Sequence, residues 1–153
     1  MKRVTVTRTR RLSQEPGSLA EDMVAEEYRE WSGFEDAGRF DLARDTGALA
    51  EVKSTATSID NPGGQVSGRF RLYRGQHESL LEHDRDGSAW YFFVLYDVST
   101  RPPVARIVRK EPAQVGRIVG ARGGWNDSGH AEIDEEYKLL HDAIFSDLEA
   151  EVS

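Results

Sequence analysis

The chain has 153 residues, no cysteine and a formal charge of −7 from 20 basic and 27 acidic side chains. A chain of this length suits one domain that buries roughly 68–70% of the surface exposed by its unfolded form. The lack of cysteine excludes disulfide scaffolds, thiolate zinc sites and cysteine nucleophiles. No apolar run approaches the ~20 residues of a membrane-spanning helix, and none follows the basic N-terminus. We therefore expect a soluble, cytoplasmic, single-domain protein.

The charges are unevenly distributed along the chain. Only four lysines accompany sixteen arginines, and this acidic, lysine-poor composition fits either a halophilic organism or the ordinary solubility of a small domain. Residues 1–11 carry five positive charges and no negative one, whereas residues 131–153 carry eight carboxylates and one lysine. Local patches set the affinity for phosphate, so an acidic chain can still have an end that binds nucleic acid.

The N-terminal third of the chain predicts one strand, one helix and a hairpin. Residues 4–7 alternate apolar and polar side chains, which is typical of a strand or an extended arm. Ser18 and Glu21 form a capping-box pattern that predicts a helix from 18 to about 31. Residues 39–44 and 48–54 predict two strands joined by a three-residue loop that ends in Gly47.

The rest of the chain predicts alternating strands and helices. The 89–98 run is almost continuously apolar, which is typical of a strand buried on both faces at the centre of a sheet. An apolar stripe at Ile133, Tyr137, Leu140, Ile144 and Leu148 predicts a C-terminal helix. The other expected elements are a loop at 58–68, a strand at 69–73, a helix at 75–84, a strand nearer a sheet edge at 104–108, a helix at 112–119 and a loop at 121–129.

The polar side of the predicted hairpin carries the chemistry. In a register whose opposing residue numbers sum to 92, Leu42 faces Ala50 on an apolar side and Asp41 faces Glu51 on the other. Two carboxylates about 4.5–5.5 Å apart at their β-carbons repel each other unless a cation lies between them. Lys53 projects from the same side. The alternative is a solvated sheet face on which basic side chains balance the two acids.

These residues resemble a known signature. Asp41, nine intervening residues and then Glu51-Val52-Lys53 are similar to the PD-(D/E)XK nuclease superfamily, in which an Asp and a (D/E)-X-Lys lie on adjacent strands. Glu51–Thr55 also resembles the EVKST nuclease-like domains, and Gly17–Glu21 is similar to the first helix of archaeal Holliday-junction resolvases. The resemblance covers roughly residues 17–98, and Phe40 stands where the family has Pro.

The resemblance implies a fold and an activity. The fold is an α/β restriction-endonuclease-like mixed sheet flanked by helices, formed by residues 1–153 with a basic arm or strand at 1–16, a catalytic core at 17–98 and a C-terminal strand and helices at 99–153. The activity is metal-dependent hydrolysis of DNA phosphodiester bonds, by an endonuclease that is selective for branched structures such as junctions.

The resemblance also implies roles for particular residues. Mg²⁺ or Mn²⁺ is bound by Asp41, Glu51, the Val52 carbonyl and a helix carboxylate, for which Glu21 is preferred over its rivals Glu26 and Glu27. Lys53 steadies the nucleophile or the phosphate oxygens, and Gln76, at the start of the next helix, positions substrate or water.

Two groups of arginines are candidates for DNA binding. Arg69, Arg71 and Arg74 lie within six residues and suit phosphate; the alternative is a solvated helix start that Glu78 and Glu82 balance. The N-terminal group either clamps DNA or belongs to a disordered end, and it consists of Arg8, Arg10 and Arg11.

Two other functions remain open at this stage. One is a non-catalytic DNA-binding or assembly module with a decayed nuclease fold, and the other is an RNA-directed nuclease with the same metal site. Resolution of junctions also implies a homodimer, because two strands are cut symmetrically; the 89–98 strand and the C-terminal helix are the candidate contacts. The four histidines lack metal-ligand spacing and are expected to be ordinary surface or helix residues.

Overall fold

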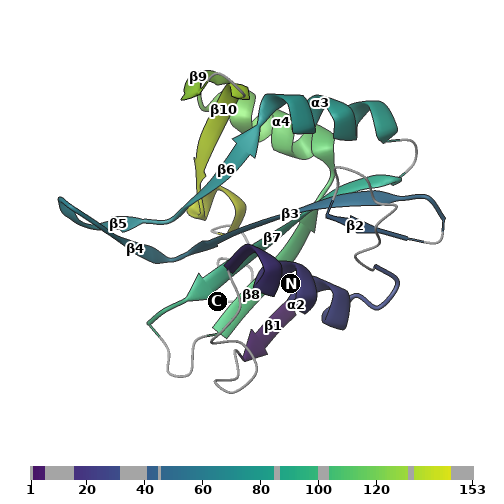
Figure 1. The fold of residues 1–153 in the computed structure, drawn as a ribbon, viewed down its shortest axis with the longest axis horizontal. Coiled ribbons are helices and arrows are strands. Elements are labelled where there is room, and N and C mark those ends of the chain that lie inside the picture. Colours follow the sequence, from purple (N-terminus) through teal and green to yellow (C-terminus); the bar gives the residue numbers. More distant parts are fainter. Residues whose placement is uncertain are drawn as a thin grey trace.

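The computed structural model describes residues 2–5, 16–31, 41–44, 46–84, 87–99, 104–130 and 133–145 (Figure 1). The helices are α2 (Pro16–Glu27), α3 (Arg74–His83) and α4 (Pro112–Ala121). The strands are β1 (Lys2–Thr5), β2 (Leu42–Ala43), β3 (Leu49–Ala56), β4 (Ser58–Asn61), β5 (Gly64–Ser67), β6 (Arg69–Tyr73), β7 (Ala89–Asp97), β8 (Val104–Lys110), β9 (Asn126–His130) and β10 (Ile133–Leu140).

The main sheet has five strands in the order β1-β8-β7-β3-β2. β3 and β7 are parallel, and the other neighbours are antiparallel, so the sheet is mixed. β7 lies at its centre, which confirms the prediction from the apolar 89–98 run. Because β7 has a strand neighbour on both sides, its backbone is not available for a dimer contact, and that expectation is wrong.

The predicted hairpin register is correct. Leu42 pairs with Ala50 and Ala43 with Leu49, so the numbers of opposing residues sum to 92. Gly47 has φ of 86°, the left-handed conformation expected of a glycine in this short loop. The predicted pair of Phe40 with Val52 involves a residue that lies outside the described part of the chain.

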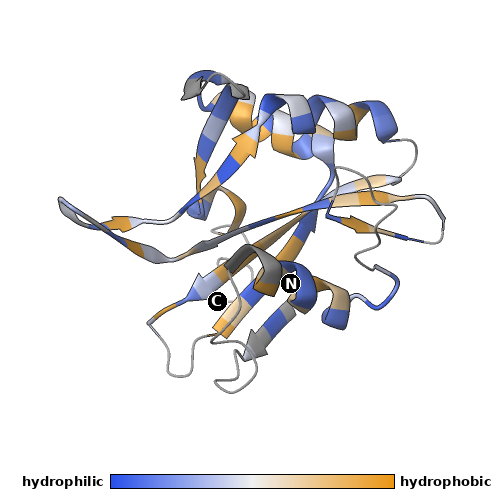
Figure 2. Ribbon diagram, viewed as in Figure 1, coloured by the Kyte–Doolittle hydropathy of each residue, from blue (hydrophilic) through white to orange (hydrophobic). Residues whose placement is uncertain are grey.

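The main sheet separates two hydrophobic clusters, because successive side chains of a strand point to opposite faces. Phe92 and Val94 of β7 pack on the face that α2 covers, whereas Tyr91, Phe93 and Leu95 pack on the other face. The second face is covered by α3, α4 and a three-stranded sheet in the order β6-β10-β9 (Figures 1 and 2). This α/β arrangement of a mixed sheet flanked by helices is the fold expected from the sequence.

Four segments differ from the sequence expectations. The predicted helix with the stripe from Ile133 is strand β10, and its last residue, Leu148, lies outside the described residues. The expected loop at 58–68 is an antiparallel ribbon of β4 and β5, and the loop at 121–129 includes most of β9. Helix α2 begins at Pro16 rather than at a Ser18 cap, and it ends at Glu27. The strand at 69–73, the helices at 75–84 and 112–119 and the strand at 104–108 are confirmed within a few residues.

Candidate active site

Glu51 and Lys53 lie on the face of β3 that meets the second hydrophobic cluster. They pair in register with Tyr91 and Phe93 of β7, which belong to that cluster. Glu51 is only 2% exposed, and its Oε1 has no hydrogen-bond partner within the described residues. Burial, together with repulsion from Asp41, raises the pKa of Glu51 to about 8. The site therefore contains a carboxyl group that holds its proton at neutral pH.

Asp41 lies immediately before the edge strand β2 and is fixed by the backbone of β3. The Val52 N–H donates a hydrogen bond of 2.7 Å to Asp41 Oδ2, and the Asp41 N–H donates one of 3.1 Å to the Ala50 carbonyl. These contacts hold the Asp41 carboxylate beside Glu51, whose pKa it raises. The two acids that the hairpin register places opposite each other therefore interact, as the sequence predicts.

Glu21 brings a third carboxyl group from α2. Its pKa rises to about 7, because burial disfavours the charged form and Asp41 both repels it and shares a hydrogen bond with it. Glu21 also contributes to the raised pKa of Glu51, which favours it over its rivals Glu26 and Glu27 as the helix acid of the site. The acids thus form a chain from helix to sheet, Glu21 to Asp41 to Glu51.

Lys53 is held by its neighbours in one orientation. Its Nζ donates a hydrogen bond of 2.8 Å to Gln76 Oε1, lies 3.9 Å from Glu51 Oε2 and sits 4.8 Å from the centre of the Tyr73 ring. The side chain is 12% exposed, and burial lowers its pKa. Gln76 therefore lies at the site as the sequence predicts. Tyr73 was missed, although its place two residues after Arg71 on an alternating strand put it on the same polar side.

The donor set fits a hard divalent cation. The three acids and the Val52 carbonyl offer only oxygen atoms, which Mg²⁺ and Mn²⁺ prefer. Within the described ranges, no three acidic or histidine side chains gather closely enough to bind a metal as they stand. Burial and repulsion from Asp41 raise the pKa of Glu21 to about 7 and that of Glu51 to about 8, so at neutral pH these acids retain protons that compete with a cation. A cation would replace those protons and give Glu51 Oε1 the partner it lacks.

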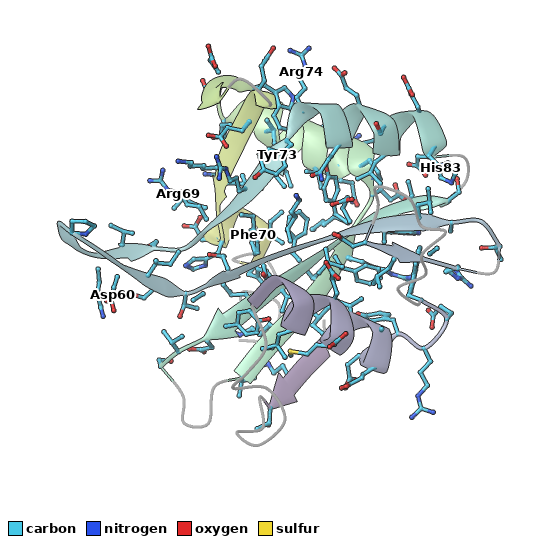
Figure 3. The ribbon with its side chains drawn as sticks, in the orientation of Figure 1. Asp60, Arg69, Phe70, Tyr73, Arg74 and His83 are labelled. Carbon is cyan, nitrogen blue, oxygen red and sulfur yellow. The ribbon has the colours of Figure 1, made fainter. Side chains whose placement is uncertain are left out.

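Two of the three arginines near α3 already have carboxylate partners. Arg71 Nε lies 2.5 Å from Glu136 Oε2, and Arg74 makes ion pairs with Glu78 at 3.0 Å and Glu135 at 2.8 Å. The sequence suggested Glu78 and Glu82 as the acids that balance these arginines. Glu78 does so, but the other two partners, Glu135 and Glu136, come from β10. Arg69 is exposed (Figure 3) and has no ion pair within the part of the chain that the structure describes. Three further candidates lie outside that part: Arg8, Arg10 and Arg11.

The two histidines of α3 have structural contacts. His77 is buried, and its Nδ1 lies 3.0 Å from the Tyr91 hydroxyl. The Nε2 of His83 lies 2.9 Å from the Gly47 carbonyl oxygen. The hydrogen-bond partners of these two rings are thus Tyr91 and Gly47, which agrees with the sequence interpretation of the histidines as ordinary surface or helix residues.

Comparison with protein families matches residues 7–146 to the PD-(D/E)XK nuclease superfamily domain. The chain belongs to this superfamily. Membership in the PD-(D/E)XK superfamily accounts for the mixed sheet flanked by helices, and it supports a nuclease-like function that acts on nucleic acid with divalent metals such as Mg²⁺ or Mn²⁺. Comparisons with curated proteins and with solved structures gave no match. Among the helices described for this PD-(D/E)XK chain, none is both long and apolar enough to span a membrane.

Proposed function

We propose that this PD-(D/E)XK protein is a Mg²⁺- or Mn²⁺-dependent deoxyribonuclease that cuts phosphodiester bonds internally. One observation carries the proposal: a buried, incompletely hydrogen-bonded Glu51 lies between a second acid, Asp41, and the fixed ammonium of Lys53. A carboxylate pair that only binds DNA would repel the phosphates that approach it. Such a pair beside a lysine suits a site where the acids bind a cation and the lysine contacts a phosphate.

The proposed metal ligands are Asp41, Glu51 and the Val52 carbonyl, with Glu21 acting directly or through water. When bound, the cation stabilises negative charge on the phosphate and lowers the pKa of a water. The Val52 N–H keeps Asp41 oriented through its 2.7 Å hydrogen bond. Asp41 therefore enters the site already positioned, which reduces the entropic cost of organising the ligands.

Lys53 and Gln76 are proposed to act on the phosphate side of the site. An ammonium held 3.9 Å from Glu51 brings positive charge to the place where charge develops on the phosphate oxygens. The Gln76 carbonyl oxygen accepts the Lys53 hydrogen bond, so its amide nitrogen is left to orient substrate or water. Burial limits solvent screening of these interactions.

The substrate is proposed to be DNA with a branched structure, which resembles the substrate of junction resolvases. Symmetric cutting of two strands needs a two-fold homodimer. Because β7 is enclosed by its neighbours, that dimer would need contacts other than the backbone of the 89–98 strand, one of the two candidates from the sequence.

The test is cleavage of linear, single-stranded, flapped and four-way DNA, with matched RNA strands, in Mg²⁺ or EDTA. We expect Asp41→Asn, Glu51→Gln and Lys53→Met each to lower the rate by at least about 100-fold, the order of magnitude that removal of one transition-state interaction costs. Asp60→Asn is the matched control, because it removes an exposed carboxylate from the β4–β5 ribbon.

Each result selects one function. Wild-type cleavage by Asp41→Asn would contradict the assignment of the site. Binding of DNA without metal-dependent cleavage would support a module with a decayed site, and faster cutting of RNA than of any DNA would support a ribonuclease.

A further inference from the structure

A pocket of about 400 Å³ lies beside β6 and β10, away from the acids of the site. Basic side chains from three separate segments meet in it: Arg69 from β6, Arg122 from just after α4, and Lys138 from β10. The other lining residues are Asn126, Asp127, Glu136 and Tyr137. Only Arg69 was a sequence candidate, because the three basic residues are far apart in the chain.

The pocket keeps an excess of positive charge. Within the described residues, none of its three cationic side chains has an ion-pair partner. Of the two carboxylates that line it, Glu136 is engaged by Arg71 at 2.5 Å. Asp127 is the other acid, so the three cations outnumber the acids and the pocket favours a ligand with negative charge.

A continuous polar surface joins this pocket to Lys53. Arg69, Arg71 and Tyr73 alternate with the buried Phe70 and Leu72, so they share one face of β6. The Tyr73 ring lies 4.8 Å from Lys53 Nζ and 5.5 Å from Arg71 Cζ. Arg69 and Tyr73 mark opposite ends of β6 in Figure 3, toward the ribbon and toward α3.

The length of this surface matches a run of nucleic-acid backbone. Tyr73 lies four residue steps along β6 from Arg69, which is about 13 Å at 3.3 Å per residue. In a duplex, one strand carries a phosphate about every 3.4 Å of the helix axis, so a duplex whose axis runs along β6 would have about four phosphate intervals over this distance.

We propose that a duplex lies with its axis along β6, and that the pocket of Arg69, Arg122 and Lys138 binds one of its backbone phosphates about four positions from the bond being cut. The inference rests on the proposed function, because Lys53 marks the position of that bond. The ligand class is a phosphodiester polyanion. A phosphate there sets the direction in which the strand crosses the acids, and Arg71 and Arg74, already paired with carboxylates, hold the sheet and helix that form the surface.

Salt-dependent binding tests the pocket without relying on cleavage. Removal of one phosphate contact reduces the slope of log affinity against log salt by about 0.9 for duplex DNA. We expect that reduction for Arg122→Gln and for Lys138→Gln, measured by fluorescence anisotropy of a labelled duplex in EDTA. Arg117→Gln is the matched control, because it replaces an arginine of α4 that lies outside the pocket, and we expect it to keep the wild-type slope.

A second set of binding measurements tests where along the nucleic acid the pocket binds. The Arg122→Gln and Lys138→Gln effects are expected with a duplex that extends past the cut site toward the pocket, and are expected to disappear with one that ends before it. Inorganic phosphate is expected to displace the duplex no more than chloride of equal ionic strength. Stronger displacement that Arg122→Gln abolishes would overturn the proposal in favour of a small-anion site.

The remaining outcomes separate the two proposals. If the wild type cuts DNA but both pocket variants behave like Arg117→Gln, the pocket inference is wrong and the nuclease proposal stands. If the wild type binds but does not cut, and the pocket variants show a reduced slope, the nuclease proposal fails and the binding site stands. A wild type that binds no nucleic acid contradicts both.

Discussion

The Lys53 side chain shows how one residue acquires a fixed position from three different contacts. An amide oxygen at 2.8 Å, a carboxyl oxygen at 3.9 Å and an aromatic face at 4.8 Å surround its ammonium. A free lysine loses as much as about 2 kcal/mol of rotamer entropy when it is ordered. Here the Lys53 side chain is ordered when the chain folds, so substrate binding does not have to order it before it can contact a phosphate.

Tyr73 is predicted to be a positioning residue for Lys53. Replacing it by Leu removes a cation–π contact worth about 0.5–2 kcal/mol, so single-turnover cleavage at saturating DNA should fall by about 2- to 30-fold. Tyr73→Phe keeps the ring and should restore the rate. A Leu variant with the wild-type rate, or a Phe variant that is equally slow, would contradict the role of the ring; thermal unfolding checks that both variants fold.

The acids and the lysine of the site could be predicted because strand geometry is local. Side chains alternate between the two faces of a strand, so Glu51 and Lys53 lie on the same side of β3. The hairpin register, in which the numbers of opposing residues sum to 92, brings Asp41 to them. The same alternation puts Tyr73 on the face of Arg71, but its contact with Lys53, and the meeting of Arg122 with Lys138, could not be predicted in this way. These contacts arise through the packing of β6, β10 and α4 in a second sheet and helix layer, which no local spacing encodes.

At the scale of elements, Gly68 controls how closely the β4–β5 ribbon and β6 approach β3. A Cβ at this position would lie 1.7 Å from the Ala56 carbonyl oxygen and 2.6 Å from Thr55 Oγ1. The closer of these contacts is with backbone, which cannot move aside like the end of a side chain. Gly68 is thus the point at which two layers of the structure can meet.

We predict that Gly68→Ala lowers the free energy of unfolding by about 1–3 kcal/mol or more, because relief of the overlap must displace backbone. Gly75→Ala, in α3, is the matched control: its Cβ would have nothing within 4 Å, and the helix should gain up to about 1 kcal/mol. Urea unfolding measures both. Equal stability of the two variants would contradict the close approach.

The contact of α3 with α4 gives the fold a dependence on pH. His77 is buried against Tyr91 and Trp125, with Gly116 of α4 beside its ring and Glu78 as the nearby charge. Burial lowers the pKa of His77, so the folded state favours the neutral ring. The unfolded chain binds the proton first, at its ordinary pKa of about 6.5.

The contribution of His77 to stability is therefore complete above about pH 6.5 and is lost as the pH falls toward the lowered folded pKa. We predict that His77→Gln flattens the decline in unfolding free energy between about pH 7 and 5. His83→Gln is the control, because its side chain is only partly buried; it should keep the wild-type decline. Urea titrations at several pH values measure this, and an unchanged decline in His77→Gln would contradict the prediction.

Strand β10 shows why element type was harder to predict than register. Leu139 lies in the core and Tyr137 packs against it, while Glu136 and Lys138 alternate with them. The apolar Leu140 that follows breaks this alternation and mimics a helical stripe with Ile144. Pairing of β10 with both β6 and β9 decides the outcome. The pairing with β9 is local, but the pairing with β6 joins segments more than 60 residues apart, as between Leu140 and Arg69.

For the whole molecule, the proposed metal ligands connect parts that otherwise pack on different sides. α2 covers one face of the main sheet, Glu51 points to the other, and Asp41 at the edge interacts with acids from both. Without a cation, the buried acid costs stability, because burial of a charged or unpartnered carboxyl group is unfavourable. A cation that binds only the folded chain reverses that cost.

We predict that thermal unfolding separates these effects. In EDTA at neutral pH, Glu51→Gln should unfold at a temperature at least as high as the wild type. The raised pKa of Glu51 costs the wild type stability, because its unfolded chain ionises this group and its folded chain does not, whereas an amide does not ionise in either state. Mn²⁺ should stabilise the wild type by about 2.7 kcal/mol at 100 times its dissociation constant, and Glu51→Gln should lose that gain. Asp60→Asn should keep it, since Asp60 lies on the exposed ribbon. An equal gain in Glu51→Gln would show that the ion binds elsewhere, and would leave the buried acid without the role assigned to it.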